Sequence, residues 1–241
     1  MRHVALGDSY SAGGGLSGGT APCGRAPGAY PALAAAAEGW DLVVATCNGA
    51  TTADVVERDQ YPGVGPQVTA LAGPVDLVTI SIGGNDIGFA PTMTECVIGQ
   101  LPCDRLEPEV TAALAALGPR LATVLDELRA RAPAARLVVV GYPHLVADPD
   151  LAGYQTCAGV TAPEARWLRA KAVDLAAVVR SAAEAAGALY VDSLAAFAGH
   201  EACTAEPWMA GLTLSGIDGS FHPNAAGHQR LADLVRQAAR A

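Results

Sequence analysis

Five short apolar runs, separated by alanine-rich stretches, constrain the fold of this chain more than any other feature of its sequence. Each run is rich in Val, Ile or Leu, as is typical of strands buried on both faces. The stretches between them show helical spacing, and several begin with proline, which favours the first turn of a helix. The predicted strands are 3–6, 42–45, 77–82, 137–140 and 188–191, and the predicted helices are 27–38, 108–131, 163–186 and 223–240.

This alternation predicts one parallel sheet covered by helices on both sides. A chain of 241 residues fits a single α/β domain, residues 1–241, better than two domains. Longer irregular segments occur at 11–26, 88–106, 141–162 and 192–221. Each follows a predicted strand, so we expect these segments to gather at the carboxyl edge of the sheet, where open α/β sheets bind ligands.

Charge and hydropathy exclude two classes of partner. The formal net charge is −9 and the pI is about 4.9, which argues against a nucleic-acid partner. No segment approaches the roughly 18 uninterrupted apolar residues of a membrane-spanning helix, so we expect no integral membrane span. We expect a monomer that acts on a small-molecule or lipid substrate.

The cysteines indicate an oxidising compartment. Six are many for a cytosolic protein of this size, and an even number suits three disulfides. None forms a Cys-x-x-Cys pair, which argues against a zinc-ribbon site and a thioredoxin-like redox motif. The layout of the loops suggests sequential pairing of Cys23 with Cys47, Cys96 with Cys103, and Cys157 with Cys203.

A secreted location follows as an expectation. Because residues 1–6 already have the pattern of a core strand, we expect a secreted domain whose signal peptide was removed. A cytosolic protein with buried free thiols is the alternative.

A tight turn follows the first predicted strand and carries a candidate nucleophile. The residues Gly7-Asp8-Ser9-Tyr10 place Ser9 at the edge of the sheet, where its hydroxyl can meet a substrate. A serine hydroxyl becomes reactive only when a base and hydrogen-bond donors for an oxyanion converge on it. The flanking Asp8, like Asp86 further along, is expected to brace a turn by bonding nearby backbone N–H groups.

Three further segments supply those partners at successive loops. Gly49 follows the second strand and can present its backbone N–H without a side chain in the way, and Asn85 follows the third strand on a glycine turn. His222 stands just before the last predicted helix and is the candidate base. The oxyanion hole would then use the N–H groups of Ser9 and Gly49 and the amide of Asn85.

These four segments, in this order, resemble the GDSL or SGNH hydrolase superfamily, whose motif blocks are anchored by Ser, Gly, Asn and His. The run 7–13, the cysteine spacing and Gly141-Tyr142-Pro143 further resemble secreted actinobacterial esterases, lipases and phospholipases A1 of that superfamily. The resemblance implies a flavodoxin-like three-layer α/β/α sandwich with a five-stranded parallel sheet. It also implies three sequential disulfides and neither a metal nor an organic cofactor.

One departure from the family pattern concerns the group that orients the histidine. Most members carry Asp three residues before the histidine, whereas this chain has Gly219 there, and the nearest carboxylate is Asp218. Some secreted members are similar in using a main-chain carbonyl for this role. We therefore predict a Ser9–His222 dyad oriented by the Gly219 carbonyl, with Asp218 as the alternative acceptor.

The resemblance thus implies a secreted carboxylic-ester hydrolase, an esterase or lipase or a phospholipase A1, acting through an acyl-enzyme. Two alternatives remain open. One is a polysaccharide deacetylase of the same fold, and the other is a non-catalytic module that binds lipid or glycan.

Overall fold

A parallel five-stranded sheet forms the centre of the protein. The structure is a computed structural model that describes residues 1–99, 101–151, 154, 156–213 and 219–241. The strand order is β2-β1-β3-β4-β7, so β1 lies between the next two strands of the chain. The strands are β1 (Arg2–Gly7), β2 (Asp41–Val44), β3 (Leu77–Ser81), β4 (Arg136–Val140) and β7 (Leu189–Val191). Each agrees with its predicted range to within one residue at either end.

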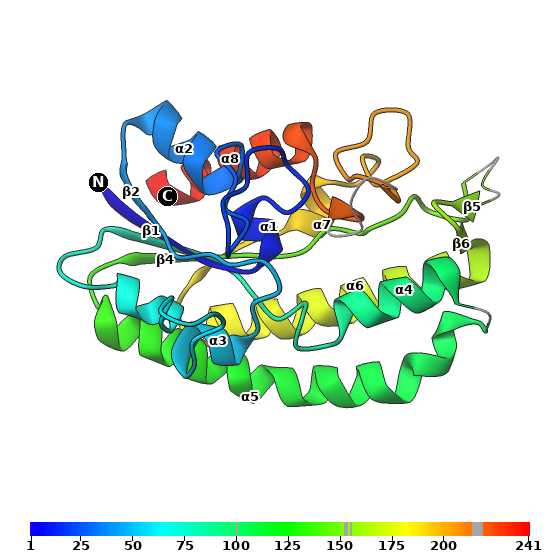
Figure 1. The fold of residues 1–241 in the computed structure, drawn as a ribbon, viewed down its shortest axis with the longest axis horizontal. Helices are drawn as coiled ribbons and strands as arrows, with labels where there is room; N and C mark the ends of the chain where they lie inside the picture. The colour runs from blue at the N-terminus through cyan, green and yellow to red at the C-terminus, as the bar shows by residue number, and fades with distance from the viewer. Residues whose placement is uncertain (100, 152–153, 155, 214–218) are drawn as a thin grey trace.

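Helices cover both faces of this sheet. Helices α2 (Tyr30–Glu38) and α8 (Ala225–Arg240) pack side by side on one face. The opposite face carries α3 (Thr52–Val56), α5 (Glu107–Arg131) and α6 (Ala162–Ala185), with α5 against α6 (Figure 1). The predicted three-layer α/β/α sandwich is therefore confirmed.

The four predicted helices begin within three residues of their predicted starts. The predicted helix 27–38 begins at Tyr30, because Pro27 and Gly28 form a turn and Ala29 is extended ahead of the helix. The predicted helix 223–240 begins at Ala225, since the side chain of Asn224 accepts hydrogen bonds from Ala226 and Gly227 and so caps it. Helices α5 and α6 each start one residue earlier than predicted, at Glu107 and Ala162.

The segments that we predicted to be irregular contain a ten-residue helix and several shorter elements. Helix α4 (Phe89–Ile98) lies within 88–106, although its proline and β-branched residues disfavour a helix in isolation. Burial of Met93 and Cys96, together with a disulfide at its C-terminal end, holds it in place. The shorter elements in or beside these segments are α1 (Ser9–Ala12), η2 (Cys103–Leu106), β5 (Thr156–Cys157), β6 (Val160–Thr161) and α7 (Ser193–Ala196). A further short helix, η1 (Gln67–Ala70), lies ahead of β3.

The core lies between the sheet and its helices. Val4, Leu6 and Ile80 of the central strands are fully buried. Leu117 and Leu121 of α5 are buried too, and their spacing puts them on one face of that helix. Among the described residues, none of the helices is both long and apolar enough to cross a membrane.

Three disulfides join the loops, in the pairing that the sequence suggested. Cys23 bonds Cys47, Cys96 bonds Cys103, and Cys157 bonds Cys203, so all six cysteines are paired. The first bond ties the loop after β1 to the loop after β2. Disulfides of this number fit an extracellular protein.

The disulfides should contribute to stability according to the length of chain that they close. Cys157–Cys203 spans 46 residues and Cys96–Cys103 spans 7. From the chain-entropy model we expect the free energy of unfolding to fall by about 4 kcal/mol for the Cys157→Ser/Cys203→Ser variant and by about 2 kcal/mol for Cys96→Ser/Cys103→Ser. Denaturant titration measures both values, and the reverse ranking would contradict this prediction.

Candidate active site

Ser9 is the first residue of α1 and follows the end of β1 by two positions. The side chain of Asp8 caps the helix by accepting a hydrogen bond of 3.0 Å from the Tyr10 N–H. Gly13 ends the helix in the left-handed region at φ 88°. This single turn holds the Ser9 side chain, which is half-buried, at the carboxyl edge of the sheet.

The hydroxyl of Ser9 meets the ring of His222. Ser9 Oγ and His222 Nε2 lie 2.6 Å apart, although the two residues are 213 positions apart in the chain. His222 is only 6% exposed, and the rings of Tyr10 and Phe89 lie 5.0 and 6.0 Å from its ring, centre to centre. The Tyr10 hydroxyl in turn donates to the Phe221 carbonyl at 2.7 Å.

The acceptor that faces Nδ1 of His222 differs from the prediction. The Ser220 carbonyl oxygen lies 2.9 Å from Nδ1, so the structure gives Ser220 in place of Gly219. Phe221, which lies between Ser220 and His222, adopts φ 58°. This conformation turns the chain back, so that the Ser220 carbonyl reaches the ring of His222. The backbone of Gly219 instead lies against Gly15. Asp218, the predicted alternative, lies outside the described residues.

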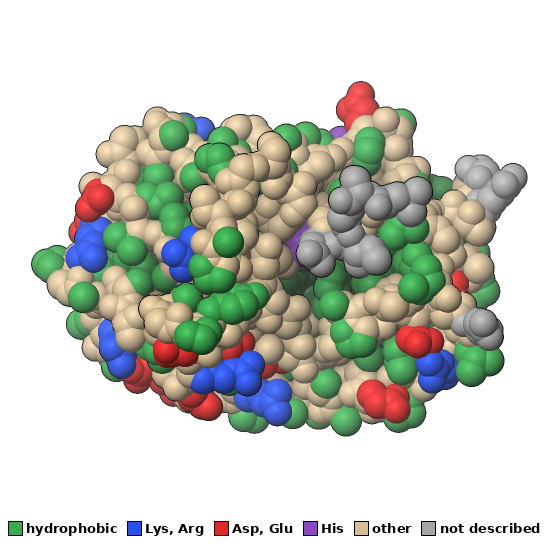
Figure 2. All heavy atoms as spheres, in the orientation of Figure 1, with side chains coloured by type: hydrophobic (Ala, Val, Ile, Leu, Met, Phe, Trp, Pro, Cys, Tyr) green, Lys and Arg blue, Asp and Glu red, His purple; other side chains and the backbone are tan. Residues whose placement is uncertain are grey.

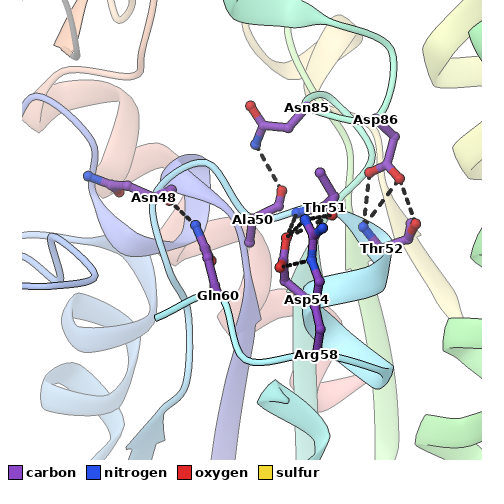
Figure 3. A network of polar contacts seen from close by, with 9 residues as sticks. All are labelled: Asn48, Ala50, Thr51, Thr52, Asp54, Arg58, Gln60, Asn85 and Asp86. Atoms are coloured by element: carbon purple, nitrogen blue, oxygen red, sulfur yellow. Dashed lines mark hydrogen bonds and ion pairs between the residues drawn. The ribbon is translucent and has the colours of Figure 1, made fainter. Parts of the chain in front are cut away.

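The donors predicted for an oxyanion hole stand on loops that follow adjacent strands. Gly49 is exposed in the loop after β2, at φ 76°. Within the part of the chain that the structure describes, its N–H has no hydrogen-bond acceptor. Asn85 follows β3, and its Nδ2 donates to the Ala50 carbonyl at 2.9 Å (Figure 3). A primary amide has two N–H bonds, so one remains to bind another acceptor.

A network of polar contacts ties these two loops together (Figure 3). The carboxylate of Asp86 accepts from both the N–H and the hydroxyl of Thr52, at 3.0 and 2.5 Å. On the other side of the loop, Gln60 Nε2 donates to the Asn48 carbonyl at 2.6 Å. These hydrogen bonds of Asp86 brace the neighbouring loop, which fixes Gly49 relative to Asn85.

A buried carboxyl group lies directly beside the candidate nucleophile. Tyr142, from the loop after β4, donates its hydroxyl proton to Asp8 Oδ2 at 2.5 Å and accepts from the Gly84 N–H at 3.1 Å. The Tyr142 hydroxyl thus joins the turn that carries Ser9 to the turn that carries Asn85. Burial raises the pKa of Asp8 to about 7, although the hydrogen bonds from Tyr142 and the Tyr10 N–H act in the opposite direction.

Two cavities meet at Ser9. The first, which we call the apolar pocket, extends between α4, α5 and α6, and Phe89, Met93, Val110, Leu168 and Leu175 are among its lining residues. The second, which we call the open groove, runs past Gly49, Tyr61, Leu212 and His222. Ser9, Asn85, Phe89 and Met93 line both. Figure 2 shows the surface hollowed around a histidine, with hydrophobic side chains along its walls.

Sequence reasoning missed the residues that shape the apolar pocket and the contact between Tyr142 and Asp8. The stretch Gly141-Tyr142-Pro143 was noticed only as a family resemblance. Gly14 was missed as well: a Cβ at this position would lie 2.9 Å from the His222 ring and 3.0 Å from the Ser9 side chain. Among the described residues, no group of three or more His, Cys, Asp or Glu is placed to hold a metal ion.

The burial of Asp8 predicts an unusual dependence of stability on pH. In the unfolded chain Asp ionises at a pKa of about 4, whereas folded Asp8 holds its proton to a pKa of about 7. Between these values the folded state binds the extra proton, so the contribution of Asp8 to the free energy of unfolding falls as the pH rises. Asp8→Asn removes this titration.

Denaturant unfolding at a series of pH values measures the effect. We expect the free energy of unfolding of the wild type, minus that of Asp8→Asn, to decrease between pH 4 and pH 7. Asp41→Asn, on the exposed first residue of β2, controls for the loss of one carboxylate. A difference that stays constant or grows over this range would contradict the prediction.

Comparison with known proteins places this arrangement in a family. A model of the GDSL-like lipase/acylhydrolase family matches residues 5–230. Lipase 2 of Streptomyces coelicolor is 40% identical over 258 aligned positions, which cover 97% of this chain and 84% of that protein.

Two solved structures are similar over their whole length. An extracellular lipase from Streptomyces rimosus superposes with a TM-score of 0.88 at 35% identity, covering 99% of each chain. A phospholipase A1 from Streptomyces albidoflavus gives a TM-score of 0.85 at 37% identity, covering 100% of this chain and 99% of that one. With the family model matching most of its length, the chain belongs to the GDSL-like lipase/acylhydrolase family and is an ester hydrolase.

Proposed function

We propose that this protein is a secreted hydrolase of aliphatic carboxylic esters, with Ser9 as nucleophile and His222 as general base. The observation that carries the proposal is the 2.6 Å contact between Ser9 Oγ and His222 Nε2 at the point where the two cavities meet. The three disulfides and the extracellular relative from S. rimosus support secretion.

The geometry around His222 supports its role as a base. A carbonyl oxygen can only accept a hydrogen bond, so the neutral ring carries its proton on Nδ1, facing Ser220. Nε2, which lies 2.6 Å from Ser9 Oγ, then accepts the proton of Ser9 as the hydroxyl attacks the ester carbonyl. The resulting imidazolium returns that proton to the leaving alkoxide, and the same ring later activates the water that hydrolyses the acyl-enzyme.

The negative charge that develops on the ester oxygen requires fixed donors. The N–H groups of Ser9 and Gly49 and the free N–H of the Asn85 amide stand on loops after three adjacent strands, β1, β2 and β3. Because Asp86 and Tyr142 lock these loops to one another, the donors need little rearrangement during the reaction. This arrangement supports a three-donor oxyanion hole.

The two cavities indicate how an ester would bind. The apolar pocket suits an aliphatic acyl chain, because its walls offer almost no hydrogen-bond partner. The open groove carries more polar groups and suits the alcohol part. Relatives named as lipases and a phospholipase A1 support a lipid ester as the substrate. A deacetylase of polysaccharides would place only an acetyl group in the pocket and leave most of its apolar wall without contact.

Replacement of Ser9 tests the nucleophile. We expect Ser9→Ala to lower kcat for a p-nitrophenyl ester by about 10⁴-fold or more while the thermal unfolding midpoint stays close to that of the wild type. Ser17→Ala, in the exposed loop after α1, serves as the matched control. A fluorophosphonate probe should label the wild type and the control but not Ser9→Ala. Absence of labelling in the wild type would favour the non-catalytic binding module.

Replacement of Asn85 tests the oxyanion hole. We expect Asn85→Ala to lower kcat by about 10²- to 10³-fold with little change in KM, because the lost donor acts mainly on the transition state. This substitution also removes the hydrogen bond to Ala50. Thr52→Val loosens the same junction between loops but leaves the amide intact, so it should have a much smaller effect. Equal losses in the two variants would assign Asn85 a purely structural role.

A further inference from the structure

The apolar pocket that reaches Ser9 is also lined by side chains of α6. Trp167 and Lys171 both line it, and because they are four residues apart they lie on the same face of the helix. Lys171 is the only lysine in the chain, and its side chain is 15% exposed. A lysine in this position covers apolar space with its methylene stem and turns its ammonium group outward.

Glu107, the first residue of α5, holds both of these side chains. Its Oε2 accepts from the Trp167 indole N–H at 2.5 Å, and its Oε1 accepts from Lys171 Nζ at 2.9 Å. The Thr111 hydroxyl also donates to Oε1 at 2.9 Å. The hydrogen bonds from Lys171, then Trp167 and Thr111, lower the pKa of Glu107 to about 2, so it stays ionised over the ordinary pH range.

These hydrogen bonds link α5 to α6, and we call the three residues Glu107, Trp167 and Lys171 the latch. The Glu107 side chain is 46% exposed, whereas the indole of Trp167 and the methylene groups of Lys171, which it holds, face the pocket. The polar atoms of Trp167 and Lys171 are therefore satisfied at the surface, which leaves only their apolar parts toward the cavity.

We propose that Trp167 and Lys171, held in place by Glu107, form the end wall of the apolar pocket and set the longest acyl chain that this enzyme binds well. The inference rests on the proposed function, because it assumes that the acyl chain of the ester occupies this pocket. The inference goes beyond the proposed function because it assigns the limit on acyl chain length to three residues.

The physical basis is the balance between burial and displacement. Each methylene group that enters the pocket should raise kcat/KM by about fourfold, the factor that corresponds to burial of one CH₂. A chain longer than the pocket must either leave methylenes in water or push Trp167 away from Glu107. Displacement breaks the hydrogen bond of the indole N–H and costs part of that gain. The kcat/KM value should therefore rise with chain length to a maximum and then fall.

Variants that lengthen and shorten the pocket test this wall from both sides. The readout is the ratio of kcat/KM between long and short p-nitrophenyl esters, measured from acetate to palmitate. Trp167→Ala removes the wall, so we expect the maximum to move to longer chains and the long-to-short ratio to rise by at least tenfold. Glu107→Ala releases the ring without deleting it and should produce a smaller shift in the same direction. Ala172→Phe fills the pocket beside the wall and should move the maximum to shorter chains.

A matched control separates loss of the latch from loss of charge. Glu109→Ala removes a carboxylate from the same first turn of α5, at an exposed position that does not line the pocket. It should leave the position of the maximum unchanged. Thermal unfolding of each variant identifies any that fails to fold, in which case Ala172→Phe still tests the inference in the opposite direction.

The possible results discriminate between the two proposals. Suppose that the wild type hydrolyses these esters and Ser9→Ala does not. If Trp167→Ala and Ala172→Phe then change kcat/KM by the same factor at every chain length, the end wall is wrong and the proposed function stands. If the wild type hydrolyses none of the esters, the proposed function fails and this inference falls with it. Opposite shifts of the maximum in Trp167→Ala and Ala172→Phe would support the end wall.

Discussion

The parallel pairing of β1 with β2 on one side and β3 on the other is the constraint on which the candidate active site depends. It brings the loops that carry Ser9, Gly49 and Asn85 to one edge of the sheet, although 76 positions separate the first of these residues from the last. The pairing is close at its end: a Cβ on Gly7 would lie 2.2 Å from the Ser81 carbonyl, so only glycine fits there. The Asp8 N–H then continues the ladder to that carbonyl at 2.9 Å.

The loops at this edge are held by side chains as well as by the sheet. The Tyr142 hydroxyl connects Asp8 to the Gly84 N–H, and Asp86 connects the loop after β3 to Thr52. The nucleophile and the candidate oxyanion donors are therefore positioned by hydrogen bonds between groups of the protein itself. Such preorganised polar contacts are the means by which enzymes stabilise charge in a transition state. This arrangement costs free energy, because burial disfavours the ionised form of Asp8 and so raises its pKa.

The sheet and the long helices could be predicted because their patterns are local. Alternation of apolar runs with helical spacing identified all five strands of the sheet and the helices α2, α5, α6 and α8, with small errors at the ends. Helix α4 was missed because its own residues favour it little, and it depends on burial of Met93 and on the disulfide at Cys96. The Ser220 carbonyl was missed for a similar reason. The left-handed conformation of Phe221 decides which carbonyl faces His222, and a non-glycine residue gives no sign of it.

The sequence by itself determined the fold class, the pairing of the cysteines and the four residues, Ser9, Gly49, Asn85 and His222, that the family pattern marks. It could do so because strand and helix periods, loop positions and motif order are all local patterns or linear orders in the sequence. Only the tertiary structure decided that Tyr142 reaches Asp8 across 134 positions and that Glu107 holds Trp167 across 60. Those contacts depend on how the helices pack over the sheet and on where each side chain finds a partner once it is buried, and no local pattern records either.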